Sequence, residues 1–149
     1  MSLAMTEAER EAFLADVHVA ILALPDGDRG PLCAPVWYNV APSGELYFLT
    51  QATSRKGRLI AEGGRLTMTV QRETAPYAYV SVEGPVTAVE PYDLEADLLP
   101  MAMRYLGAEG GRGYADAMRA SWNPEASIKV TVRPERWLSV DYVKRGGAV

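Results

Sequence analysis

The chain has 149 residues, of which 48% are hydrophobic and 23% are charged, and its formal net charge is −4. These values are typical of a soluble domain with one core, and they exclude disordered and fibrous classes. A negative chain has no general attraction for nucleic acid, and its apolar runs reach less than half of the ~20 residues that a membrane span needs.

The start of the chain and its cysteine content favour a cytoplasmic location. The first residues contain neither a cluster of positive charge nor a long apolar stretch, so we expect no secretory signal. We interpret residues 1–4 as a remnant of expression and Met5 as the native start. Cys33 is the single cysteine and cannot form an internal disulfide, which fits a reducing compartment. We expect residues 1–149 to form one domain.

The N-terminal third predicts a helix followed by antiparallel strands. Thr6 and Glu9 have the spacing of a capping box, which predicts a short helix to about Asp16. Alternating apolar residues and turn-forming residues predict the elements after it. They are strands over 17–25, 32–40 and 46–51, a turn over 26–31 that makes the first two strands a hairpin, and a short helix over 55–62.

The remainder predicts further strands, interrupted by helices. Gly84 and Pro85 cannot continue a regular central ladder, so we expect a bulge or bend at this point of a long strand. The expected elements are strands over 65–72, 77–90, 128–133 and 136–143, and two helices within 91–122 that the glycine run 110–113 separates. This order suits an antiparallel barrel better than a doubly wound sheet.

The residue inventory excludes several kinds of active site. His18 is the only histidine and lies in a predicted strand, so we expect neither a histidine-dependent triad nor a histidine-rich metal site. No phosphate-binding GxxxxGK[ST] loop is present. Most clustered carboxylates lie at predicted helix starts, where capping explains them. The catalytic residues therefore remain unassigned, and no metal site is predicted.

One cluster of hydroxyls and cations stands out in residues 50–58. The predicted end of a strand and first turn of a helix bring together Thr50, Thr53 and Ser54 with Arg55, Lys56 and Arg58. Such groups form charge-assisted hydrogen bonds to a phosphate, each of roughly 1.5 to 3 kcal/mol. The residues alone leave two interpretations open, a phosphate site and a solvated basic turn, and they favour the second slightly.

Residues 46–56, Leu-Tyr-Phe-Leu-Thr-Gln-Ala-Thr-Ser-Arg-Lys, resemble the strand-turn-helix of the pyridoxamine 5′-phosphate oxidase-like flavin-binding split barrels. Residues 35–39, 77–84 and 136–142 are similar to other strands of that superfamily. The resemblance covers nearly the whole chain, although only the Ser-Arg-Lys stretch is specific by itself. It implies a mainly β split barrel of six to seven antiparallel strands with peripheral helices.

The resemblance also implies which residues bind the cofactor. It assigns the cofactor phosphate to Thr50, Ser54, Arg55 and Lys56. The candidate contacts of the flavin ring, partly through the backbone, are Val36, Trp37, Tyr38 and Asn39. Simple core packing is an equal alternative for Trp37. The family forms its site across a two-fold dimer, which implies that Trp137 and Tyr142 close the pocket of a second copy.

Tyr79 completes the expected site residues. Tyr38 and Tyr79 are candidate proton donors to a substrate, and a purely structural role is an equal alternative for both.

Two departures from the true oxidase argue against pyridoxamine phosphate oxidation. Ala34 stands where the oxidase has an arginine, and the oxidase's C-terminal arginine and histidine pair is absent after Trp137. The chain length, the helical insert and the ending over 136–142 look more like the branch that binds the deazaflavin coenzyme F-420. We therefore favour F-420 over FMN as the cofactor.

These features together predict a cytoplasmic oxidoreductase. It would transfer a hydride between F-420 or FMN and a small conjugated organic substrate, with the cofactor supplying the redox chemistry. The expected partners are a small-molecule substrate and a second copy of the chain, with neither nucleic acid nor a membrane. The alternatives are a non-catalytic carrier of a flavin, a haem or another tetrapyrrole, and a flavin-sensing interaction protein.

Overall fold

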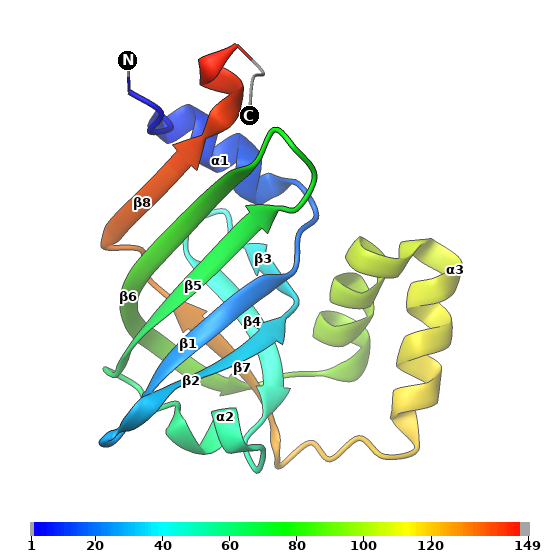
Figure 1. Cartoon of the computed structure of the whole chain (residues 1–149). Helices are drawn as coiled ribbons and strands as arrows, with labels where there is room; N and C mark the ends of the chain where they lie inside the picture. Colours follow the sequence, from blue (N-terminus) through cyan, green and yellow to red (C-terminus); the bar gives the residue numbers. More distant parts are fainter. Residues whose placement is uncertain (1, 147–149) are drawn as a thin grey trace.

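A curled antiparallel sheet forms the body of the molecule, and a helical insert projects from one side of it (Figure 1). The computed structural model describes residues 2–146. The strands are β1 (Ala20–Asp26), β2 (Arg29–Val36), β3 (Tyr38–Val40), β4 (Leu46–Gln51), β5 (Arg65–Arg72), β6 (Ala78–Pro91), β7 (Ser127–Val132) and β8 (Arg136–Asp141). Their order is β2-β1-β5-β6-β7-β4-β3, and β8 pairs with β6. The predicted mainly β split barrel is confirmed, but it has eight strands rather than six to seven, because one predicted strand is divided in two.

The helices lie outside this barrel. They are α1 (Glu7–Ala15), α2 (Arg55–Leu59) and α3 (Leu99–Arg119), with a single π-helical turn (Leu94–Leu98) before α3 and a 3-10 turn (Tyr142–Arg145) after β8. The predicted capping box is present at α1, where the Thr6 amide donates to Glu9 Oε2 at 2.7 Å and the Glu9 amide donates to Thr6 Oγ1 at 3.2 Å. No helix within residues 2–146 is both long and apolar enough to cross a membrane.

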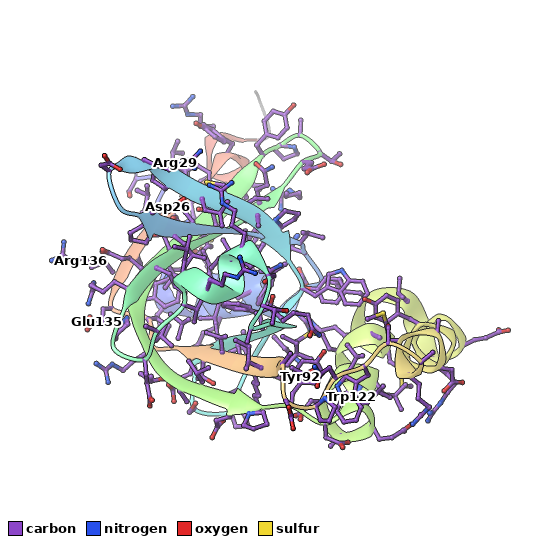
Figure 2. The ribbon with its side chains drawn as sticks, turned by 90° about the horizontal axis from the view of Figure 1, so that it is seen from below. Asp26, Arg29, Tyr92, Trp122, Glu135 and Arg136 are labelled. Atoms are coloured by element: carbon purple, nitrogen blue, oxygen red, sulfur yellow. The ribbon has the colours of Figure 1, made fainter. Side chains whose placement is uncertain are left out.

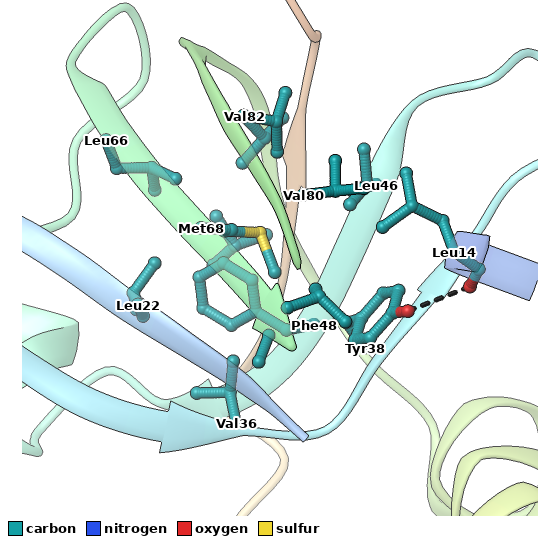
Figure 3. Packing of buried hydrophobic residues seen from close by; sticks show 14 of the residues in the cluster. Leu14, Leu22, Val36, Tyr38, Leu46, Phe48, Leu66, Met68, Val80 and Val82 are labelled. Carbon is teal, nitrogen blue, oxygen red and sulfur yellow. Dashed lines mark hydrogen bonds between the residues drawn. The ribbon is translucent and has the colours of Figure 1, made fainter. Parts of the chain in front are cut away.

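Every second residue along the strands points inward, and these residues form the barrel core, as the alternating sequence predicts. Figure 3 shows this packing, in which β1, β4, β5 and β6 contribute most of the buried side chains. The largest fully buried side chains include Tyr38, Phe48, Leu22, Leu46 and Met68. Tyr38 keeps its polar atom satisfied, because its hydroxyl donates to the Leu14 carbonyl of α1 at 2.8 Å.

The second predicted strand, over 32–40, is divided into β2 and β3. Val36 still pairs with Ala20 of β1, whereas Tyr38 pairs with Phe48 of β4. Trp37 lies in neither ladder, because the chain passes from one part of the sheet to another at this residue. The turn before β2 is also shorter than predicted, since Gly27 adopts φ +55° and the β1–β2 pairing extends to Asp26.

Strand β6 passes from one part of the sheet to the other near the predicted irregularity. It pairs with β5 up to Pro85 and with β7 from Val86, and the register shifts between Val86 and Ala88. The backbone of Gly84 lies so close to the 133–135 loop that an added Cβ would be 1.8 Å from the Arg133 carbonyl oxygen. A side chain at residue 84 is therefore incompatible with this crossing.

The helical insert reverses direction at a different glycine from the one predicted. Gly107 has φ +79° and breaks α3, whereas the glycines of the 110–113 run lie inside its second segment. At Gly111 an added Cβ would lie 2.6 Å from Met103 Cα, so this glycine allows the two segments to pack closely. Glu95 of the π-helical turn also forms ion pairs with Arg112 and Arg119 of the second segment.

The two glycines Gly111 and Gly113 provide a matched test of this packing. We expect Gly111→Ala to lower the free energy of unfolding by about 1–3 kcal/mol through overpacking against Met103. Gly113→Ala adds a methyl group with no neighbour within 4 Å and should raise the free energy by about 0.5–1 kcal/mol through helix propensity. Urea unfolding followed by circular dichroism measures both. Equal effects of the two substitutions would contradict the close packing.

Candidate functional site

A groove of about 400 Å³ lies between the barrel and the helical insert. The barrel contributes Val36 and Trp37 from the β2–β3 junction, Thr50 from the end of β4, and Lys56 from α2. The insert contributes apolar and aromatic side chains, including Met101, Tyr114 and Met118. The groove therefore unites part of the predicted ring-contacting strand with part of the predicted phosphate site. Figure 2 shows Tyr92 and Trp122 at this junction of barrel and insert.

The charge in this groove comes from a single side chain among the described residues. Lys56 is the one charged side chain among the described residues that line it. Thr50, only 6% exposed, adds a hydroxyl to the lining. Lys56 forms no ion pair within residues 2–146. A groove lined by one cation, a hydroxyl, and several apolar and aromatic side chains fits an amphipathic anion with a flat ring system.

The other two predicted phosphate ligands have partners within the chain. Ser54 caps α2, because its hydroxyl accepts from the Gly57 amide at 3.1 Å and donates to the Gln51 carbonyl at 2.6 Å. Arg55 forms an ion pair at 3.0 Å with Asp26 from the β1–β2 hairpin, and its side chain is 60% exposed. Neither side chain lines the groove. Sequence spacing placed these residues on one turn but could not show where each side chain points.

Gly57 determines how closely α2 packs on the end of β4. An added Cβ would lie 2.1 Å from the Gln51 carbonyl oxygen and 2.9 Å from Ala52 Cα. Gly57 is itself buried at this contact. The absence of a side chain at this residue therefore fixes Lys56, its neighbour in sequence, beside the end of the strand.

Trp37 is partly buried and forms a wall of the groove. Its ring stacks on Tyr105 with centroids 4.9 Å apart and an interplanar angle of 7°. Tyr114 lies on it at 5.2 Å with a tilt of 51°. Trp37 thus packs against the insert, and it also lines the groove.

The next two residues of the predicted ring-contacting strand do not line this groove. The Tyr38 side chain is fully buried in the barrel core, and this burial raises the pKa of its hydroxyl. Asn39 Oδ1 accepts from the Val40 amide at 2.8 Å. The division of the strand at Trp37 explains the change, because β3 follows the register of β4.

Tyr79 and Trp137 lie away from the groove within a single chain. In β6, Tyr79 pairs with Val140 of β8 and alternates with buried neighbours, so its side chain is on the outer face of the sheet. Trp137 pairs with Val82 and therefore lies on the opposite face. It lines a second cavity of about 690 Å³ beside α1, where the Arg10 guanidinium carbon is 4.7 Å from its ring centroid.

Sequence reasoning did not assign the residues that the insert contributes. Met101, Tyr105 and Tyr114 belong to a segment whose helical periodicity was recognised, but periodicity does not show which surface a helix covers. The available signal was the concentration of aromatic and methionine side chains in residues 91–122.

Comparisons with known proteins agree with this architecture. The sequence matches the family described as Pyridoxamine 5′-phosphate oxidase over residues 6–140. No curated protein matches it. A conserved hypothetical protein of Mycobacterium tuberculosis has a similar structure, with a TM-score of 0.76 and 25% identity over 99% of this chain and 91% of that chain.

Two further solved structures share the fold at lower identity. One carries the name F-420 reductase, with a TM-score of 0.67 and 23% identity over 86% of this chain and 94% of that chain. The other is named as the FAD-binding protein of Mycobacterium smegmatis, with a TM-score of 0.59 and 15% identity over 91% of this chain and 95% of that chain. Because the family match runs from the cap of α1 into β8 and includes every barrel residue of the groove, this chain belongs to the pyridoxamine 5′-phosphate oxidase family.

Proposed function

We propose that this protein binds a phosphorylated flavin-type cofactor in the groove and transfers a hydride between it and a small conjugated organic substrate. The observation that carries the proposal is the set of lining residues, in which Lys56, Thr50 and Gln51 are polar and the others are apolar or aromatic. A phosphate carries the charge that Lys56 can pair with, and an isoalloxazine or deazaflavin ring suits the wall formed by Trp37.

Coenzyme F-420 is the favoured cofactor, and FMN is the alternative. The favoured choice rests on the departures from the oxidase pattern at Ala34 and after Trp137 and on the helical insert. One structure with the same fold is named F-420 reductase. Pyridoxamine phosphate oxidation is not proposed, because the residues for the substrate phosphate are missing from the sequence.

The bound cofactor would supply the hydride chemistry, and the chain supplies anchoring, orientation and exclusion of water. Lys56 would hold the anionic end, with Thr50 as a further hydroxyl. Trp37 would limit the position of the ring. Met101 and Met118 of the insert form the apolar wall opposite the barrel and would keep water from the reacting ring. Tyr38 is not proposed as a proton donor, since its hydroxyl donates to Leu14 within the core.

We also propose a two-fold dimer formed through the outer face of the sheet. Two apolar side chains are exposed there, Ile21 at 41% and Leu138 at 59%. Tyr79 lies on the same face, so this dimer would bring that predicted site residue toward the second copy. Trp137 packs beside Arg10 on the other face, so its proposed contact with a partner would require the edge of β8 rather than this surface.

Cofactor titration tests the proposal directly. Purified protein should quench the fluorescence of FMN or F-420 with a dissociation constant in the micromolar range or below. Riboflavin serves as the matched control, because it has the ring of FMN without the phosphate and should bind more weakly. Failure of both FMN and F-420 to bind would overturn the proposal.

Non-catalytic cofactor binding is the second candidate function. It is favoured by one observation: the described residues that line the groove include neither a carboxylate nor an imidazole. Steady-state oxidation of reduced F-420 or reduced FMN by quinones, enones or biliverdin distinguishes the two functions. Turnover with any of these acceptors supports the oxidoreductase, and tight binding without turnover supports the carrier.

A further inference from the structure

We propose that Tyr105 of α3 is a positioning residue that sets the orientation of Trp37 and thereby the shape of the groove. The inference concerns the proposed function, since it treats Trp37 as the wall against which the cofactor ring lies. It assigns a role to the helical insert beyond covering the barrel. Three sets of contacts support it.

The first set of contacts fixes the backbone directly after Trp37. The chain leaves the β1 ladder after Val36 and joins the β4 ladder at Tyr38. At this point the Tyr105 hydroxyl accepts from the Tyr38 amide at 3.0 Å and donates to the His18 carbonyl at 2.6 Å. One side chain thus satisfies backbone groups from two segments where the regular ladder is interrupted.

The second contact fixes the Trp37 ring itself. The rings of Trp37 and Tyr105 are nearly parallel, at an interplanar angle of 7°. The same tyrosine therefore restrains both the backbone and the side chain of this segment. Tyr114 also touches the Trp37 ring, but it is tilted by 51°, and its hydroxyl has no hydrogen bond to the protein within residues 2–146. Tyr114 is for this reason a suitable comparison.

The third set of contacts holds Tyr105 in place. Its neighbour Arg104 donates from Nη1 to the Ala15 carbonyl at 3.2 Å and from Nη2 to the Asp16 carbonyl at 3.1 Å. These bonds attach α3 to the end of α1. Met101 lies four residues before Tyr105 on the same helical face and lines the groove. The insert thus supplies one wall directly and positions the other wall through Tyr105.

Tyr105→Phe tests the role of the hydroxyl with the ring retained, and Tyr114→Phe is the matched control. Both are made in a background with Trp122→Phe and Trp137→Phe, which leaves Trp37 as the only tryptophan. We expect Tyr105→Phe to change the near-ultraviolet circular dichroism of Trp37, to increase its quenching by acrylamide, and to weaken cofactor binding about tenfold. Tyr105→Leu should have a larger effect on all three. Tyr114→Phe, which keeps its ring against Trp37, should leave the near-ultraviolet circular dichroism and the acrylamide quenching of Trp37 as they are in the background protein.

The measurements separate this inference from the proposed function. If neither cofactor binds to the unaltered protein, the proposed function fails, and the Trp37 signals of the cofactor-free protein still judge the role of Tyr105. Equal Trp37 signals for Tyr105→Phe and Tyr114→Phe would overturn the inference, even if Tyr105→Phe lowers the melting temperature. Far-ultraviolet circular dichroism establishes that each variant is folded. With Tyr105 intact, Trp37 should also show high fluorescence anisotropy, and a freely rotating ring would overturn the inference without any Tyr105 variant.

Discussion

Replacing Lys56 with glutamate is expected to raise the dissociation constant of the cofactor by about a hundredfold or more. Lys56 is the one charged side chain among the described groove-lining residues, so its removal leaves the phosphate without a cation in the groove. Lys56→Ala loses one charge-assisted hydrogen bond and should weaken binding about tenfold. Lys56→Glu adds repulsion between two negative charges. Fluorescence titration with FMN and F-420 measures both variants.

Two controls make this result specific for the phosphate. Arg58 is an exposed cation on the same short helix, and Arg58→Ala should change the affinity by less than about twofold. Riboflavin, which lacks the phosphate, should bind to the Lys56 variants as it binds to the unaltered protein. If riboflavin and FMN lose affinity equally, Lys56 supports the groove structurally and the proposed phosphate site is misplaced.

Gly57→Ala is expected to cause the second large effect, a loss of about 2–4 kcal/mol in the free energy of unfolding. The added methyl carbon would lie 2.1 Å from the Gln51 carbonyl oxygen and 2.9 Å from Ala52 Cα, and both are backbone atoms rather than the end of a flexible side chain. The first turn of α2 must therefore move away from β4. Because Lys56 is adjacent, cofactor affinity should also fall. Urea unfolding and cofactor titration measure the two effects.

Gly30→Ala is the matched control for this substitution. Gly30 lies in β2, has no neighbour within 4 Å of an added Cβ, and needs no positive φ. The same chemical change should therefore alter the free energy of unfolding by less than about 0.5 kcal/mol. A stability of Gly57→Ala equal to that of Gly30→Ala would show that α2 adapts easily. It would remove the argument that this glycine fixes the position of Lys56.

The features predicted from the sequence are those that depend on neighbouring residues and not on which distant segment packs beside them. Alternation in β4, β5 and β6 predicted which side chains face the core, because a strand has two faces whatever its neighbours are. The Thr6 and Glu9 capping box was likewise local and is present at α1. The strand-turn-helix at residues 46–56 was predicted in the right place, and its Thr50 and Lys56 line the groove.

The sequence did not show in which direction the side chains of the predicted site point. Ser54 and Arg55 have the residue types of phosphate ligands, but Ser54 caps α2 and Arg55 pairs with Asp26, which lies 29 residues earlier in the chain. The partner of a surface arginine depends on which loop folds beside it. Trp137 and Tyr79 were grouped as site residues by resemblance, whereas the register of β6 and β8 puts them on opposite faces of the sheet.

By itself, the sequence determined the mainly β class, most strands, the first helix and the strand-turn-helix that carries Lys56, because periodicity and capping need only neighbouring residues. Only the tertiary structure decided that the chain breaks at Trp37, that the insert reverses at Gly107, and that Tyr105 packs on the break. These features depend on which distant segments pair and pack together. A pairing register or a helix face becomes defined only when its partner is in place.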